Sequence, residues 1–121
     1  MNRHGKVLLF WNKDILTVQA KGPFNEEGAL AEINKIKVFI LQKNAIKWYK
    51  LRIWDEESLG SSEAINMAKN YHKWCLENGC VKTAYVVCNS IQKSISEKIY
   101  SGTAKIFQSE YDAKKWLLSD I

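Results

Sequence analysis

Apolar positions along the chain follow first a strand period and then a helical one. Two runs rich in β-branched and aromatic residues, 6–11 and 15–21, are separated by a short polar loop, which is typical of a β-hairpin. In the second run Leu16, Val18 and Ala20 alternate with polar side chains, so one face of this strand is expected to be partly exposed. The hairpin is therefore expected to form one edge of a sheet.

From residue 25 onward, helical and strand patterns alternate. Asn25 is expected to cap a helix that extends to near Asn44, because leucine and isoleucine recur in it at helical spacing. Later strands are expected at 46–54, 81–88 and 104–107, and the helices after them are expected to begin at Ser61 or Ser62, at Asn89 and at Ser109. The strand at 81–88 is the least polar and is expected to be central.

This order, ββαβαβαβα, predicts an α/β fold in a single small domain over 1–121, with a mixed, mainly parallel sheet flanked by helices. The net charge is +5, but lysines are spread along the chain and alternate with acidic residues on the helices. Because nucleic-acid binding needs basic residues gathered on one face, none is expected. No apolar run approaches the ~20 residues of a spanning helix, so no membrane insertion is expected.

The three cysteines indicate a reducing environment. Cys75, Cys80 and Cys88 are spaced in a way that forms no CxxC motif, and no nearby pair of histidines completes a zinc site. We expect reduced, mostly buried thiols in a cytoplasmic protein, with no metal or other cofactor.

Cations and aromatic residues are interleaved most densely at 47–52. On a strand, Lys50 and Arg52 share a face with Trp48 and Trp54. Such a face can stack nucleic-acid bases. We favour a structural interpretation, in which the lysine and arginine stems lie along tryptophans near a sheet margin or under a helix.

The sequence offers little for catalysis. His72 and Cys75 lie three residues apart on one predicted helix, a spacing that places both side chains on the same face. An activated thiol would suit this pair, but no motif supplies an oxyanion hole and no acidic pair faces inward. We therefore expect a protein that is not an enzyme, with a thiol enzyme as the weakest alternative.

The end of the chain carries a family resemblance. The strand at 104–107 is followed by a helix start and by the run Asp-Ala-Lys-Lys-Trp-Leu at 112–117. Together with the element order, this ending resembles the stand-alone SpoIIAA-like proteins of the anti-sigma-factor-antagonist (STAS) superfamily. The resemblance implies the same fold and a regulatory role exerted through protein–protein interaction.

The loop after the third strand departs from the family pattern. In phosphorylation-switched members that strand leads into Asp-Ser-Ser/Thr-Gly-Leu-Gly, whereas residues 55–60 here read Asp-Glu-Glu-Ser-Leu-Gly. Glutamates replace the phosphoacceptor hydroxyls, so the switch motif is degenerate. The alternatives are a glutamate that mimics the phosphorylated state, a shifted acceptor serine such as Ser58, or an acidic loop that only caps the next helix. The candidate interaction loop comprises Asp55, Glu56, Glu57, Ser58, Leu59, Gly60, Ser61 and Ser62.

The predicted helix after this loop has an unusually wide apolar face. The face spans roughly 200°, about twice what packing on a sheet requires. The surplus side chains need a second contact, which is the neighbouring helix, a second subunit or an apolar ligand. The candidate interface or pocket residues are Trp48, Trp54, Met67, Tyr71 and Trp74.

Two functions therefore remain open on sequence alone. The first is a non-catalytic binding module for an unidentified protein partner, centred on the loop and this aromatic flank. The second is a carrier for an apolar, lipid-like small molecule in a pocket between sheet and helices, an idea that the family's likeness to lipid-carrying domains favours. A homodimer through the same flank is compatible with both.

Overall fold

The computed structural model of the chain describes residues 5–58 and 61–119. Every predicted strand and helix is present in it, in the predicted order. The elements are β1 (Lys6–Asn12), β2 (Ile15–Lys21), α1 (Glu26–Lys43), β3 (Trp48–Trp54), α2 (Ser62–Glu77), β4 (Cys80–Val86), α3 (Ser90–Tyr100), β5 (Lys105–Phe107) and α4 (Glu110–Leu118).

The strands form one mixed sheet in the order β1-β2-β3-β4-β5. β1 pairs with β2 in antiparallel orientation, and the remaining pairs are parallel. The hairpin lies at one edge, as predicted. The strand predicted at 81–88 was expected to be central, and this was wrong by one position, because it is β4, the fourth of the five strands. Both hairpin strands, β1 and β2, lie on the same side of β3, so β3 is the middle strand.

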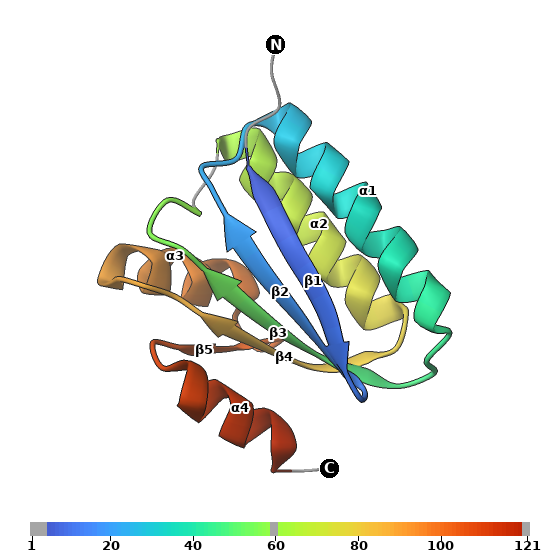
Figure 1. Cartoon of the computed structure of the whole chain (residues 1–121). Coiled ribbons are helices and arrows are strands. Elements are labelled where there is room, and N and C mark those ends of the chain that lie inside the picture. Colours follow the sequence, from blue (N-terminus) through green and yellow to red (C-terminus); the bar gives the residue numbers. More distant parts are fainter. Residues whose placement is uncertain (1–4, 59–60, 120–121) are drawn as a thin grey trace.

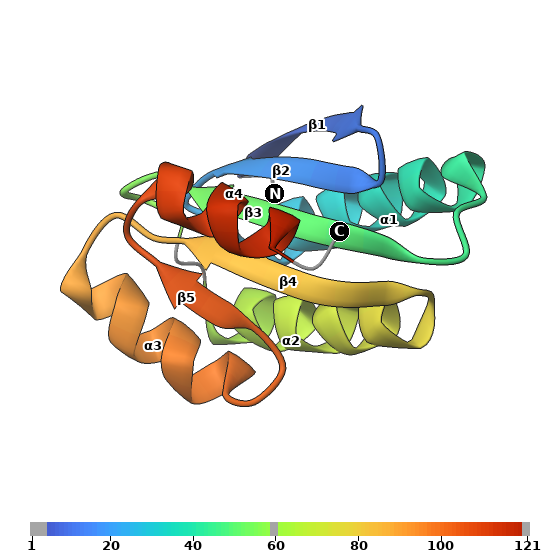
Figure 2. The ribbon, with the colours of Figure 1, turned by 90° about the horizontal axis from the view of Figure 1, so that it is seen from below.

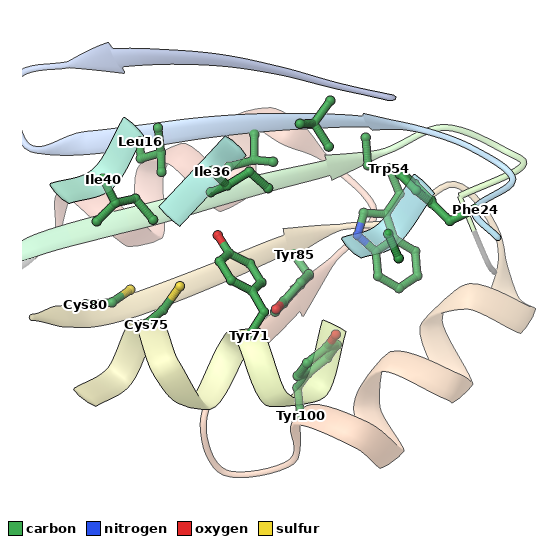
Figure 3. Packing of buried hydrophobic residues seen from close by; sticks show 14 of the residues in the cluster. Leu16, Phe24, Ile36, Ile40, Trp54, Tyr71, Cys75, Cys80, Tyr85 and Tyr100 are labelled. Carbon is green, nitrogen blue, oxygen red and sulfur yellow. The ribbon is translucent and has the colours of Figure 1, made fainter. Parts of the chain in front are cut away.

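Helices cover both faces of the sheet, as Figures 1 and 2 show. α1 and α2 lie on one face together with α3, and α4 lies on the other. Strands β2 to β5 follow one another across the sheet in one direction, and each parallel pair is joined by a right-handed crossover. The crossover helices α1, α2 and α3 therefore lie on a common face of the sheet. The larger hydrophobic core lies between the sheet and these three helices, and Figure 3 shows part of it. A smaller core lies beneath α4.

The predicted caps begin all four helices. The side chains of Asn25, Ser61, Asn89 and Ser109 accept hydrogen bonds from backbone N–H groups three residues later, at 2.8–3.2 Å. These bonds satisfy donors that would otherwise lack a partner in the first helical turn. Ser61 rather than Ser62 is therefore the cap of α2.

The middle strand β3 begins at Trp48 rather than at residue 46, and Ile46 is 94% exposed. The backbone N–H of Trp48 donates to the Gly79 oxygen, and its indole Nε1 donates to the Asn78 oxygen at 2.9 Å. Along the strand, side chains alternate between the two cores. As a result, Lys50 and Arg52 lie under α1, α2 and α3, with exposed fractions of 0% and 8%.

Candidate functional site

The loop after β3 is held by a buried hydroxyl. Ser58 is only 8% exposed, and its Oγ accepts a hydrogen bond from the Asp55 N–H at 2.8 Å. The same hydroxyl lies within donating distance of Asp55 Oδ1 (2.7 Å) and of the Ala20 oxygen (3.0 Å). In this position Ser58 stabilises the turn and ties it to the end of β2.

Further bonds fix the loop backbone. Asp55 Oδ1 accepts from the N–H groups of Gly22 and Glu57. The buried side chain of Gln92 donates from Nε2 to the Asp55 oxygen and accepts from the Cys88 N–H through Oε1, both at 2.8 Å. The side chain of Gln92 therefore links the ends of β3 and β4.

The outer side of the candidate interaction loop is acidic and exposed. Glu56 and Glu57 are exposed, as are Ser61 and Ser62 at the start of α2. Leu59 and Gly60, the other two members of the predicted loop, lie outside the described residues.

The predicted aromatic flank of α2 lies largely inside the protein. Trp48 and Tyr71 are 0% and 1% exposed, so a partner cannot contact them in this conformation. Met67 and Trp74 are partly buried against the main core. The ammonium group of Lys37 on α1 lies 5.2 Å from the centre of the Trp74 ring, so the neighbouring helix supplies the second contact for this flank.

His72 and Cys75 do not form a reactive pair. Thr103 Oγ1 donates to the Tyr100 oxygen at 3.0 Å, so it accepts from His72 Nε2 at 3.0 Å, and His72 Nδ1 then accepts from the Tyr85 hydroxyl at 3.3 Å. Burial, with smaller contributions from Lys50 and Arg52, lowers the pKa of His72 to about 4. Both imidazole nitrogens of the neutral ring are thus used in structural hydrogen bonds.

The three thiols differ in accessibility. Cys75 and Cys80 are buried, with exposed fractions of 0% and 4%, and Cys88 is exposed at the end of β4. Burial raises the pKa of the Cys88 thiol, and the negative charges of Glu56 and Asp55 raise it further. All three are free thiols.

A cavity lies between β3 and the three helices on its face. Its apolar wall is formed by Ile33 and Ile36 of α1, Ala64 and Ala68 of α2, and Ile95 and Ile99 of α3. Arg52 and Trp54 of β3 line it from the sheet, Glu32 from α1, and Ser58 from the loop. The cavity volume is about 50 Å³.

The cavity differs from the pocket that the sequence suggests. Of the predicted pocket residues only Trp54 lines it, whereas Trp48, Met67, Tyr71 and Trp74 do not. The sequence pattern did not identify Arg52 as a cavity residue, because the arginine stem was expected to lie along a tryptophan near a sheet margin or under a helix, with a structural role. The sequence signal that could have indicated the cavity was the pair Ala64 and Ala68 on the inner side of α2, because small side chains leave space.

Two buried cations stand side by side on β3 without an acidic partner. Lys50 Nζ lies 3.6 Å from Cys75 Sγ and 4.5 Å from the centre of the Tyr71 ring. Burial acts to lower the pKa of Lys50, the neighbouring Cys75 sulfur acts to raise it, and the net direction is upward. Within 5–58 and 61–119, no carboxylate lies within 4 Å of either Lys50 or Arg52.

Some features are absent from the described part of the chain. No group of three or more His, Cys, Asp or Glu side chains there is arranged to hold a metal ion. Nor is any helix in these ranges long and apolar enough to cross a membrane.

Comparison with known proteins supports the architecture. The chain is similar to the crystal structure of an uncharacterized protein of the DUF3478 family with a SpoIIAA-like fold, from Shewanella loihica PV-4. The TM-score is 0.59, and the match covers 97% of this chain and 96% of that one. The fold is SpoIIAA-like. This confirms the predicted fold class, and at 16% sequence identity the likeness concerns the fold alone.

Neither protein-family models nor curated proteins match the sequence. The SpoIIAA-like neighbour is itself uncharacterized, so the site has to be interpreted from its own residues.

Proposed function

We propose that this protein is a non-catalytic binding domain that takes up a small, largely apolar molecule in the cavity between β3 and helices α1, α2 and α3. The main support for this proposal is the cavity itself. Concave sites with mostly apolar walls and a few polar groups are typical of small-molecule binding. This one lies beside Trp54, the last residue of β3, and ligands of open α/β sheets bind at the carboxyl ends of parallel strands.

Small side chains maintain the space. Ala64 and Ala68 of α2 and Ala29 of α1 line the cavity, where larger residues would fill it. Protein interiors are normally packed as densely as organic crystals, and an unfilled space costs stability. A cavity that three helices leave open is therefore consistent with a ligand that occupies it.

The absence of catalysis is part of the same proposal. Cys75 is fully buried, and His72 is neutral with both ring nitrogens bonded. A nucleophile needs a base within reach and access to substrate, and this pair offers neither. The free thiols suit a reducing compartment, so we place the protein in the cytoplasm.

The test is a titration monitored by methyl NMR. Short alcohols and short carboxylates, such as ethanol and sodium acetate, are added separately to the intact protein. We expect shifts that are concentrated at the Ile33, Ile95 and Ile99 methyl groups. Ala68→Leu should fill the cavity and abolish the response without lowering the melting temperature. Ala31→Leu, on α1 but away from the cavity, is the matched control and should bind as the wild type does.

If no probe of either class shifts the cavity methyl groups of the wild type, the proposal fails. It also fails if Ala68→Leu binds the probes as tightly as Ala31→Leu does, because the binding would then lie elsewhere.

A protein partner at the loop is the second candidate. Glu56 and Glu57 are exposed on a backbone that Ser58 and Gln92 hold in place, so the loop presents fixed negative charges at low entropic cost. Cross-linking in host lysate would compare the wild type with Glu56→Lys/Glu57→Lys. A partner that is lost in this variant but kept in the surface control Glu97→Lys would support the loop, and an unchanged cross-linking pattern would exclude it.

A further inference from the structure

Arg52 places a positive charge at the wall of the cavity without a partner. The residue is 8% exposed, and its Nε is buried with no hydrogen-bond partner. Among residues 5–58 and 61–119, no group forms a hydrogen bond or salt bridge with its guanidinium. The contact recorded for it is with the Trp54 ring, whose centre lies 6.0 Å from Arg52 Cζ. Buried arginines are normally paired, so a missing partner is informative.

Trp54 adds a second unused donor at the same wall. Its indole Nε1 is buried and has no hydrogen-bond partner. Figure 3 shows this nitrogen on the side of the ring nearer to Tyr85 than to Phe24. Buried indole N–H groups usually find an acceptor, and an acceptor is what both Arg52 and Trp54 lack.

The interior around the cavity carries excess positive charge. Lys50 lies two residues before Arg52 on the same face of β3 and is fully buried. Burial lowers the pKa of His72, and the charges of Lys50 and Arg52 lower it further. Glu32 also lines the cavity; its buried Oε2 makes no hydrogen bond, and Lys35 Nζ lies 3.5 Å from it.

The remaining wall is apolar and the volume is small. The cavity of about 50 Å³ is roughly a third of the ~150 Å³ that holds benzene in an engineered apolar cavity. Because benzene has six non-hydrogen atoms, a carboxylate with only one or two carbons fits such a space, whereas butyrate, which also has six, or a longer acyl chain would require α2 or α3 to move.

We propose that the cavity is a binding site for a short-chain monocarboxylate. This inference rests on the proposed ligand-binding function and specifies its ligand class. The planar guanidinium of Arg52 takes the carboxylate in a bidentate pair, the geometry that arginine provides and lysine does not. The Trp54 N–H supplies a further donor, and the short chain lies against Ile33, Ile95 and Ile99.

The experiment compares charged and neutral ligands of the same size. Acetate, propionate, butyrate and octanoate are titrated against the intact protein by calorimetry, each beside its primary alcohol or amide. We expect acetate to bind at least ten times more tightly than ethanol, a difference that corresponds to one charge-assisted bidentate pair. Affinity should fall from acetate to octanoate.

Variants at the two donors test their roles. Arg52→Met should remove the preference for carboxylate over alcohol while it keeps alcohol binding. Arg52→Lys should retain only a small part of the preference, because the fork is lost. Trp54→Phe should weaken acetate binding a few-fold. Lys105→Met, on the opposite face of the sheet, is the control and should leave acetate affinity unchanged.

A measurement on the wild type keeps the test valid if Arg52→Met does not fold. The Arg52 Nε–H signal in a ¹⁵N spectrum should shift on addition of acetate and remain still on addition of ethanol. Equal affinities for acetate and ethanol, with an unmoved Arg52 signal, would overturn the carboxylate assignment and leave the apolar pocket in place. Absence of binding by both classes would overturn the proposed function as well.

Discussion

Lys50 Nζ lies 3.6 Å from Cys75 Sγ in the centre of the main core, and no carboxylate among the described residues accompanies it. A buried ammonium group loses its hydration, and among the described residues the Cys75 and Cys80 sulfurs and the Tyr71 and Tyr85 rings compensate for part of that loss. Burial of the Lys50 ammonium group therefore lowers the stability of the fold, and substitutions of Lys50 measure by how much.

We expect Lys50→Met to change the free energy of unfolding by no more than about 1 kcal/mol, or to raise it, because a buried charge is replaced by an apolar chain of similar length. Lys50→Ala should lower it by about 2–4 kcal/mol, since it leaves a void. Urea denaturation of the two variants measures the difference. Equal destabilisation of both would show that the ammonium group itself holds the core together.

His72 should make stability depend on pH in the acidic range. Its folded-state pKa of about 4 lies below the ordinary value of 6.5, so the unfolded chain binds the proton more tightly. The stabilisation from the neutral ring is complete above pH 6.5 and is lost as the pH falls from 6.5 to about 4. The loss attributable to this group is roughly 3 kcal/mol over that window.

Urea denaturation between pH 4.5 and 7.5 would measure this dependence against His72→Gln, in which the side chain does not titrate. Carboxylates contribute equally to both proteins, so the difference between the two curves isolates the histidine. Parallel curves would mean that the imidazole is not held neutral in the folded protein.

Ser58 should behave as a structural residue. Its hydroxyl accepts from the Asp55 N–H and lies 3.0 Å from the Ala20 oxygen, so Ser58→Ala removes these bonds and leaves the two groups with only their mutual bond at 3.2 Å. We expect a loss of about 1–3 kcal/mol of stability. Ser62→Ala, at an exposed position of the same segment, should stay within about 0.5 kcal/mol of the wild type.

Thermal denaturation compares the two serine variants, and equal stabilities would contradict the structural role. The same geometry predicts that Ser58 is not phosphorylated in the folded protein, since a phosphate has to leave the interior. Intact mass of protein from the host, isolated with phosphatases blocked, should show one unmodified species.

Cys88 should be the thiol that reacts in the native protein. It is exposed, whereas Cys75 and Cys80 are buried, so iodoacetamide should label one cysteine before unfolding and three after it. The reaction should be slower than that of a free cysteine at neutral pH, because burial and the charges of Glu56 and Asp55 raise the pKa of Cys88.

Glu56→Gln removes one of these charges and should accelerate the labelling of Cys88. The distant replacement Glu97→Gln is the control. Labelling of Cys75 in the native state, followed by mass spectrometry, would contradict the packing around Lys50 and would revive the thiol enzyme.

The sequence carried enough information for the architecture. The order of strands and helices, the edge position of the hairpin and the four helix caps were all predicted correctly, because each depends on side chains within a few residues of one another. Alternation reports a strand and its two faces, and a cap is a bond between residues three apart. The ending at 112–117 also indicated the SpoIIAA-like fold before any contact was known.

Only the tertiary structure decided what the faces meet. Whether Arg52 lies at a sheet margin or in the interior depends on how many strands stack on each side of β3, and these strands come from distant parts of the chain. The cavity requires Ala64, Ala68 and isoleucines from three helices to converge, and Gln92 reaches a loop 37 residues away. Local periodicity reports which side of an element is buried. The residues against which that side is buried, and the hydrogen-bond donors that are left without an acceptor, are decided by long-range packing.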